Sequence, residues 1–422
     1  MGSDITWKKL DELTSKIGSG ATPRGGSSVY IDNGVHLIRS QNVYNDGFSK
    51  DGLVCITDKH AEELSNVEVE EEDILLNITG ASVGRLCQVP KEILPARVNQ
   101  HVAIIRPNKN ELDPLYLRYF LISSRMQEKI LSYASAGATR QALTKSMIED
   151  FRIPMLPITE QRKIGKILNT FDLKIQANQK INNSLETIAR AVFKSWFMDF
   201  DPVRAKMAGE PYPLPDEIMA LFPDELVDSE LGMIPKGWEV KKVEDYIKIQ
   251  TESINPSEIP ENRFHYYSIP AYDQNYVPLI ELGKNIQSRK YIVKKDSLLF
   301  SKLNPSTPRI WFPINCGNNS ICSTEFLVVL PKTFVNRYFL YFLFSSARFV
   351  DVARSMVTGT SSSHQRLKQR DFLDIKWIKS NQDIVLKFSD LVKSNLDKIT
   401  LNNNHNKNYQ VIRDILINRI FT

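Results

Sequence analysis

The alternation of hydrophobic and polar positions predicts short strands and one helix in the first part of the chain. Apolar runs of β-type composition at 35–38 and 102–105 lie between glycine-rich turns, as is typical of strands in a mixed domain. Apolar residues then recur at helical spacing over 114–131, with proline in the first turn, so we expect a helix there. Pro154 and Pro157 mark the end of this globular segment.

A seven-residue repeat follows. From Thr159, the expected N-cap, to about Asp199 the chain contains no proline and a single glycine, Gly165. Seven of ten core positions in a heptad register are apolar, which favours a coiled-coil helix over an ordinary surface helix. The a positions are Ile164, Phe171, Asn178, Leu185 and Val192, and the d positions are Ile167, Lys174, Ile181, Ile188 and Ser195.

The whole arrangement occurs twice. Four short motifs at 7–9, 73–76, 118–121 and 150–151 return at 238–241, 296–299, 337–340 and 371–372. This period is far too long for a solenoid repeat, so the repeated unit is a domain. A duplicated domain is suited to a target with two related halves, of which a bipartite DNA site is the commonest example.

A weaker heptad register lies near the C-terminus, 224 residues after the first. Its core positions are Phe388, Asn395, Asn402, Tyr409 and Leu416 at a, and Leu391, Lys398, His405, Ile412 and Arg419 at d. Lys398 and Asn402 repeat the polar positions Lys174 and Asn178. The recurrence of lysine and asparagine at matching positions has two interpretations. It is a coincidence, or these polar residues define the register of one helix against the other at some cost in stability.

These patterns predict an α+β protein with five parts. Residues 1–157 and 233–379 form two globular domains, 158–200 and 380–422 form long helices, and 201–232 forms a proline-rich, ordered but irregular connector. Each helix of about 40 residues is roughly 60 Å long. This exceeds one turn of DNA, roughly 34–36 Å, so a helix pair is long enough to act as a rigid spacer.

Composition adds few constraints. The 422 residues, 42% hydrophobic and 24% charged, are typical of a globular protein with two or three domains. No apolar run reaches 18 residues and no leader opens the chain, so we expect a cytoplasmic protein without a membrane segment. A net charge of +5 is compatible with a polyanionic partner, although the acidic segment 68–73 requires the basic surface to be localised. The four cysteines lack CxxC spacing and are expected to be reduced.

Motifs spread along the chain carry a family resemblance. The sequence WFMDFDPVRAK at 196–206 closes the first long helix and enters the connector, and LFPDELVDSELGMIPKGWE at 221–239 leads from the connector into the second domain. Further matches lie at 19–23, 77–85, 99–103, 137–143, 153–154 and 160–164. Together they resemble the specificity subunit of type I restriction-modification systems over essentially the whole chain. The second half departs from the pattern, with Ser-Lys-Leu-Asn-Pro at 301–305 and no Glu-Gln-Arg-Lys motif before its helix, as expected if the two domains read different half-sites.

The resemblance implies a non-catalytic subunit. It implies two target-recognition domains, each binding one half of a bipartite site in double-stranded DNA, and two long helices that pair antiparallel. Two modification subunits would dock on the helices and methylate adenine, and motor-nuclease subunits would complete the complex. S-adenosylmethionine, ATP and magnesium would bind to those partners and no cofactor to this chain. In agreement, the sequence lacks an Asn/Asp-Pro-Pro-aromatic motif, a Walker loop and a metal-ligand cluster among its six histidines.

DNA recognition requires basic and amide side chains on loops, because arginine pairs bidentately with guanine, and asparagine or glutamine with adenine. In the first domain the candidates are Arg85, Thr139, Arg140 and Gln141, followed by Arg24, Arg39 and Gln41. In the second domain they are Lys302, Asn304, Arg309, Gln365 and Arg366, with Tyr266 and Tyr272 as stacking candidates. Each has the alternative of an ordinary turn or surface residue. Phe193, Trp196 and Phe197 are candidates for partner docking, with core packing against the neighbouring domain as the alternative for Trp196.

Two other function classes remain open. A coiled-coil scaffold whose globular heads bind protein or glycan predicts no salt-dependent DNA binding. A stand-alone DNA-modifying enzyme is suggested by Asp224 ahead of Glu239 and Lys241, a spacing that loosely fits a metal-dependent nuclease. Methyl transfer by the purified chain would favour the enzyme.

Overall fold

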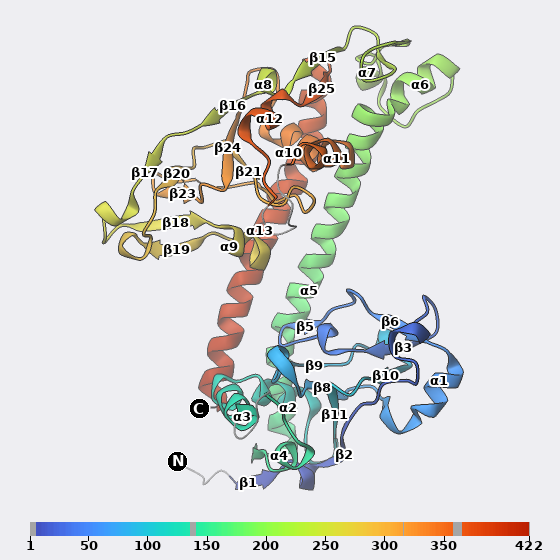
Figure 1. Cartoon of the computed structure of the whole chain (residues 1–422), viewed down its shortest axis with the longest axis vertical. Helices are drawn as coiled ribbons and strands as arrows, with labels where there is room; N and C mark the ends of the chain where they lie inside the picture. The colour runs from blue at the N-terminus through green and yellow to red at the C-terminus, as the bar shows by residue number, and fades with distance from the viewer. Residues whose placement is uncertain (1–5, 136–140, 315, 358–364, 422) are drawn as a thin grey trace. The chain divides into compact units, whose positions relative to one another are not determined.

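The computed structural model describes residues 6–135, 141–314, 316–357 and 365–421. The chain folds as two compact units. The first unit comprises the chain up to Gln176 together with the segment from Asn408 onward, and the second unit is Ala177–Lys407. Each unit combines sheets with separate helices, which confirms the α+β class (Figure 1).

Two four-stranded sheets organise the first unit. One has the antiparallel order β2-β11-β8-β9, and the other has the order β6-β3-β10-β7 with β3 and β10 parallel. Alternate side chains of β8 and β11 enter two different cores, Leu76 and Ile105 on one face and Leu75 and Ile104 on the other. Burial on both faces explains the continuous apolar runs at these strands. The strands are β1 Thr6–Lys9, β2 Thr14–Ser19, β3 Val35–Ile38, β4 Val43–Tyr44, β5 Gly47–Phe48, β6 Val54–Ile56, β7 Glu68–Val69, β8 Ile74–Asn77, β9 Leu86–Gln88, β10 Ala96–Val98, β11 Val102–Pro107 and β12 Arg152–Met155.

The expected helix over 114–131 is two helices. The chain turns at Ser123, whose hydroxyl donates to the Phe120 carbonyl at 2.6 Å and accepts from the Met126 amide at 3.4 Å. Ser123 therefore acts as an N-cap that starts a new helix, an effect of side-chain hydrogen bonding that apolar spacing does not reveal. The helices of this part are α1 Asp58–Glu63, α2 Pro114–Leu121, α3 Ser124–Ser135 and α4 Lys145–Glu149.

The second unit repeats this architecture with a larger outer sheet. Its inner sheet has the order β16-β24-β21-β22, and its five-stranded sheet has the order β17-β20-β23-β18-β19. The strands are β15 Glu239–Lys242, β16 Ile247–Gln250, β17 Ser253–Ile254, β18 Arg263–Tyr267, β19 Leu279–Leu282, β20 Lys290–Ile292, β21 Leu298–Ser301, β22 Ile310–Trp311, β23 Ser320–Cys322, β24 Phe326–Pro331 and β25 Lys376–Lys379. The helices are α8 Val243–Tyr246, α9 Ile269–Asn275, α10 Arg337–Ser345, α11 Ala347–Ser355 and α12 Gln369–Asp374.

The connector is more regular than expected. It contains helices α6 Asp201–Ala208 and α7 Asp216–Met219 and the strand pair β13 Leu226–Val227 with β14 Ile234–Pro235. Phe200, Val203 and Phe222 are buried in the main core of the second unit. Apolar anchors at this spacing give the segment a hydrophobic face to bury, so its prolines bound short helices and do not prevent them.

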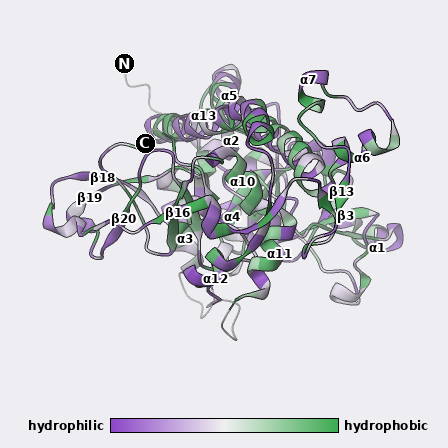
Figure 2. Cartoon of the chain, turned by 90° about the horizontal axis from the view of Figure 1, so that it is seen from above, coloured by the Kyte–Doolittle hydropathy of each residue, from purple (hydrophilic) through white to green (hydrophobic). Residues whose placement is uncertain are grey.

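Two long helices, α5 Ile158–Lys194 and α13 Gln382–Phe421, carry mixed hydrophobic and hydrophilic residues (Figure 2). Helix α5 starts directly after Pro157, so Thr159 lies inside the first turn and is not the N-cap. It ends in a π-helical turn at Ser195–Asp199, after which Phe200 adopts a left-handed backbone conformation, with φ of 58°.

The long helices pair antiparallel, as expected from the family resemblance. Within the first unit the rings of Phe171 and Tyr409 lie 6.2 Å apart, and within the second unit the Asn178 amide donates to Asn406 Oδ1 at 2.8 Å. Further along, Asn402 Nδ2 donates to Asn182 Oδ1 at 2.8 Å. Asparagines therefore meet each other in the seam, whereas Lys398 is exposed.

The expected d positions of α5 are wrong. Ile167, Ile181 and Ile188 are 57%, 44% and 58% exposed. The buried positions are instead Leu168, Ile175, Asn182 and Ala189, which follow the expected a positions by four residues. Both i+3 and i+4 neighbours of an a position lie on nearly the same helix face, so sequence spacing alone does not distinguish them.

Strand pairing aligns the two repeats 224 positions apart from β8 onward and 233 positions apart at their first strands, and it corrects the matched motifs. Asn77 ends β8 opposite Val102, and Ser301 ends β21 opposite Phe326. Asp73 therefore corresponds to Ser297 and not to Asp296, a slip of one residue.

Three further motif matches are also shifted. Trp7 pairs with Pro154 and Val240 pairs with Ile378, so Trp7 corresponds to Val240 rather than to Trp238. The amide of Leu10 donates to Phe151 and that of Val243 to Ile375, so 150–151 corresponds to 374–375 rather than to 371–372. Arg337 starts α10, whereas Arg118 lies in the middle of α2. Short identical motifs carry no register information, whereas backbone pairing does.

Candidate nucleic-acid interface

Four segments of the first unit meet where β8 ends. The Asn77 amide donates to the Arg85 carbonyl at 2.8 Å, and the Ile78 amide to the His101 carbonyl at 3.0 Å. The Leu143 amide donates to the Ile78 carbonyl at 2.8 Å. The Gly80 amide donates to the Gln141 carbonyl at 3.1 Å. We call this set of backbone hydrogen bonds the loop frame, because it presents the side chains of 79–85, 100–101 and 141 at one edge of the sheets.

The second unit has the same loop frame, displaced by 224 residues. Ser301 donates to Arg309 at 3.0 Å, Lys302 to Glu325 at 2.8 Å, Leu367 to Lys302 at 2.9 Å and Asn304 to Gln365 at 2.9 Å, all between backbone atoms. The frame therefore pairs Arg85 with Arg309 and Gln141 with Gln365. This residue-level correspondence was not available from the sequence, where the two loops differ in composition.

A left-handed residue turns each loop. Gly80 has a φ of 73° and its counterpart Asn304 has a φ of 51°. Glycine tolerates this conformation, and asparagine is among the few other residues that adopt it. Both loops therefore need a residue with positive φ at the same position. The glycine-rich loop has glycine there, and the Lys-Leu-Asn-Pro loop has asparagine.

Arg85 is the most available candidate of the first frame. Its side chain is exposed, and its guanidinium lies over the Tyr44 ring, 5.0 Å from the centroid. Such stacking orients an arginine while leaving its N–H groups free to donate. In the same frame, the Thr79 hydroxyl and His101 Nδ1 are 2.7 Å apart.

The other candidates of the first unit have mixed positions. Arg39 and Gln41 both donate to the Gly52 carbonyl, so they hold the neighbouring turn in place. Arg24 is exposed, and Gln141 is exposed with its amide 3.4 Å from the Ser135 hydroxyl. Thr139 and Arg140 lie outside the described residues.

In the second frame Arg309 is engaged. Its Nε and Nη2 donate to Asp273 at 2.6 and 2.9 Å, and its side chain is 17% exposed. Hydrogen bonding to Asp273 raises the pKa of Arg309. Tyr272 also makes contacts within the domain, because its hydroxyl accepts from the Ile310 amide at 3.3 Å and its ring packs on Trp311. Tyr266 lies under Lys290, whose Nζ is 5.4 Å from its ring centroid.

The remaining candidates lie on or beside the second frame. Lys302 and Asn304 are half-buried members of the frame itself, and Gln365 is half-buried opposite Asn304. Arg366 is 60% exposed, and its Nη2 donates to Glu325 Oε1 at 2.7 Å.

The expected docking residues are not accessible. Phe193, Trp196 and Phe197 are each 2% exposed, and they pack on Phe339 and Phe388 in the core of the second unit. Core packing, the alternative interpretation for Trp196, holds for Trp196 and equally for Phe193 and Phe197. The sequence predicted an exposed C-terminal end of α5 because the aromatic residues that cover it come from α10 and α13, far away in the chain.

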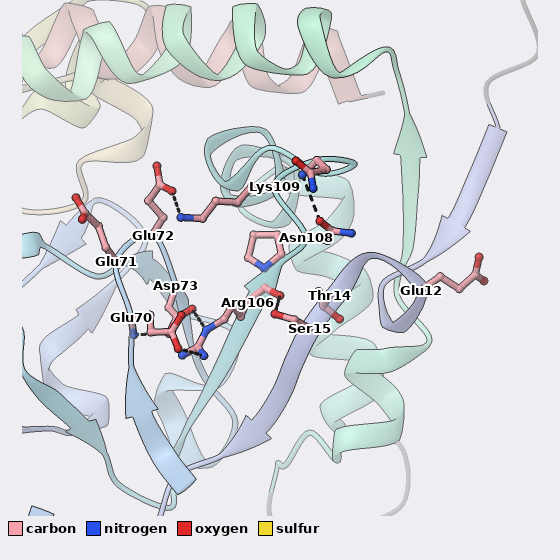
Figure 3. Close-up of a pocket in the computed structure, with 12 residues that line it drawn as sticks. Glu12, Thr14, Ser15, Glu70, Glu71, Glu72, Asp73, Arg106, Asn108 and Lys109 are labelled. Carbon is pink, nitrogen blue, oxygen red and sulfur yellow. Dashed lines mark hydrogen bonds and ion pairs between the residues drawn. The ribbon is translucent and has the colours of Figure 1, made fainter. Parts of the chain in front are cut away.

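The acidic segment of the first unit lies at the opposite end of β8 from the loop frame. Figure 3 shows Asp73, which directly precedes this strand, joined to Arg106. Arg106 Nε and Nη2 each donate to Asp73 at 2.8 Å, and Glu72 is paired with Lys109. The negative charge is thus internally compensated and separated from the frame by the length of the strand, so it does not repel an anion bound there.

Sequence reasoning missed His101, Asp273 and Glu325. Asp273 and Glu325 belong to no motif, and His101 lies within the 99–103 motif but was not singled out there; each acquires its place by meeting a residue far away in the chain. Within the described ranges, no group of three or more His, Cys, Asp or Glu side chains is arranged to hold a metal ion. The four cysteines are free thiols, and burial raises the pKa of Cys87 to about 12. No helix in the described part of the chain is long and apolar enough to cross a membrane.

Comparison with known proteins gives a consistent result. Residues 3–187 match the family model of the type I restriction modification DNA specificity domain. The type I restriction enzyme HindI specificity subunit of Haemophilus influenzae is 27% identical over 417 residues, covering 85% of this chain and 89% of the relative. The MjaIX specificity subunit of Methanocaldococcus jannaschii is also 27% identical, covering 98% and 91%.

The fold is also known. The crystal structure of a type I restriction-modification S subunit from M. genitalium superimposes with a TM-score of 0.59 at 15% sequence identity. The match covers 100% of this chain and 98% of that one, so the two chains share their fold along their whole length.

Proposed function

The chain belongs to the family of type I restriction-modification specificity subunits, and we propose that its two loop frames each read one half of a bipartite site in double-stranded DNA. The observation that carries this proposal is the duplicated frame itself. Two sets of four equivalent backbone hydrogen bonds place an arginine and a glutamine at matching positions, Arg85 with Gln141 and Arg309 with Gln365. In the second frame Asp273 holds Arg309, and the exposed arginine is the neighbouring Arg366. Arginine and glutamine are side chains that discriminate base pairs in the major groove.

The loops differ where sequence discrimination would require it. The backbone of the frame is constant, whereas the side chains at corresponding places are different, as with His101 and Glu325. A constant frame with variable side chains suits two recognition sites that share a docking geometry and read different bases. Phosphate contacts from neighbouring basic residues would supply affinity that falls with salt.

Catalysis would come from partner subunits. We propose that two modification subunits, which use S-adenosylmethionine, methylate an adenine in each half-site, and that ATP- and magnesium-dependent motor-nuclease subunits complete the assembly in the cytoplasm. In this proposal the present chain supplies base recognition and a surface for those subunits. The exposed isoleucines of α5, such as Ile167 and Ile188, are candidates for that surface in place of the buried aromatic residues.

Sequencing of adenine methylation tests the function directly. The chain is expressed with its modification subunit in a host without other adenine methylation, beside a control that lacks this chain. A bipartite methylated motif that depends on the chain is expected. If methylation is absent or unchanged, while the modification subunit works with another specificity subunit, the proposal fails and a scaffold role is favoured. Methyl transfer by the purified chain alone would instead identify an enzyme.

A further inference from the structure

Glu325 and Arg366 form a pair in the second loop frame for which the first frame has no counterpart. The frame places Glu325 where the first unit has His101, and the bridge between Leu303 and Arg366 matches that between Thr79 and Ala142. An alanine therefore stands where the second unit has Arg366. We propose that Glu325 positions Arg366 to read a guanine in the half-site of the second unit, an inference that rests on the proposed function.

The geometry distinguishes Arg366 from the other arginines nearby. Arg309 donates twice to Asp273 and its side chain is 17% exposed, so the N–H groups of its guanidinium are already occupied. Arg370 is 92% exposed, with its nearest carboxylate, Asp374, 3.9 Å away, so it is weakly held. Arg366 combines one short hydrogen bond to Glu325 with a side chain that is 60% exposed. It is therefore oriented and still has donors to offer.

Glu325 is suited to a positioning role. Its side chain is 24% exposed, and its second oxygen, Oε2, is buried without a hydrogen-bond partner among the described residues. A carboxylate in this setting is stabilised by a cation, and Arg366 supplies one. An arginine fixed in this way loses less side-chain freedom when it binds, which increases the discrimination that it can achieve.

The paired N–H donors of the Arg366 guanidinium favour guanine. Guanine presents two acceptors, O6 and N7, in the major groove, and an arginine with free N–H groups binds both. Lysine also donates to guanine O6 and N7, so a lysine at 366 would not separate base reading from phosphate contact. An alanine does separate them. It relaxes one base position if Arg366 reads a base, and it weakens binding uniformly across sequences if Arg366 contacts phosphate.

The test uses the full chain with its modification subunit and reads the methylated motif for Arg366→Ala, Glu325→Ala and the double variant. Arg370→Ala is the matched control for loss of a surface arginine. We expect a guanine at one position of one half-site. In both single variants the preference for guanine over the other bases at that position should fall about 5- to 150-fold. The double variant should relax it no further, because both changes remove one interaction. The other half-site is an internal control for folding and assembly.

Several results would overturn the inference. Wild-type motif recognition by Arg366→Ala would make this residue a bystander, and weaker methylation at every site with an unchanged motif would make it a phosphate contact. Relaxation by Glu325→Ala alone would mean that the carboxylate itself reads a base, and additive effects would mean that the residues act independently. Complete loss of methylation by either single variant would indicate a structural role. Failure of the proposed function is recognised separately, because the wild-type chain would then direct no motif.

Discussion

Asp172 of α5 and Arg413 of α13 form a buried ion pair within the first unit, although 241 positions separate them in the sequence. The same carboxylate accepts from Arg118 Nη1 and from the Tyr119 hydroxyl, each at 2.8 Å. Burial by itself would raise the pKa of Asp172, but the two arginines and their hydrogen bonds lower it below its usual value. The C-terminal helix is thus joined to the first unit through one carboxylate.

Removing that charge should destabilise the first unit strongly. Asp172→Asn leaves the buried Arg118 without its carboxylate partner and Arg413 with Asp414 alone, and breaking a buried pair typically costs about 3–5 kcal/mol. Urea unfolding of the full chain should therefore show a transition at lower urea concentration, whereas the exposed control Asp390→Asn should unfold like the wild type. Equal midpoints for Asp172→Asn and wild type would contradict a stabilising role.

The same carboxylate predicts a pH dependence. Because its pKa is lowered on folding, its contribution is fully present above the unfolded-state pKa of about 3.9 and is lost as the pH falls through the folded-state value. The stability difference between wild type and Asp172→Asn should be constant from about pH 5 to 7 and shrink below about pH 4. Urea midpoints measured across this range test the sign. A difference that grows in acid would refute it.

The left-handed position of the first loop should accept asparagine. Asn304 occupies the corresponding position in the second unit, so Gly80→Asn should retain folding and the methylated motif. Gly80→Val should cost at least about 1–2 kcal/mol, because a β-branched residue is strained at positive φ. A Cβ added at Gly80 meets no atom within 4 Å, so the penalty is one of backbone conformation and not of space. Thermal unfolding compares the two variants, and equal stability would show that the loop relaxes.

Arg85 should affect one half-site alone. Arg85→Ala removes the stacked guanidinium above Tyr44, and the discrimination at one base position should fall by about 1–3 kcal/mol. Arg309→Ala should mainly reduce stability, because Arg309 is held by Asp273. Methylation sequencing and thermal unfolding of both variants separate the two effects. Relaxed recognition in Arg309→Ala with unchanged stability would reverse this assignment.

The asparagine layer of the helix pair should show non-additive stability. Asn182→Leu leaves the Asn402 amide buried without its 2.8 Å partner, an expected loss of about 1–3 kcal/mol. The double variant Asn182→Leu with Asn402→Leu replaces both partners and should recover much of that loss. Urea unfolding of both singles and the double completes the cycle. Strictly additive losses would mean that the two amides do not interact.

The sequence by itself determined the elements whose signals are local. The continuous apolar runs of β3 and β11 predicted strands because both faces of those strands are buried, and a proline-free heptad pattern predicted α5. The duplication and the family resemblance were also legible, since they depend on the order of residues and not on their contacts. The candidate loops around Arg85 and Asn304 could be identified because turns require particular residue types.

Only the tertiary structure decided which side chains are exposed and free to contact DNA or a partner. Arg85 and Arg309 occupy equivalent positions, but Asp273 engages Arg309 and leaves Arg85 as the free member of the pair. Phe193 is buried by residues of α10 and α13, and the helix seam shifted from Ile167 to Leu168. In each case the deciding partner lies many residues away in the chain. Periodicity describes a segment against an average environment, whereas the availability of a side chain depends on the particular distant residue that packs against it.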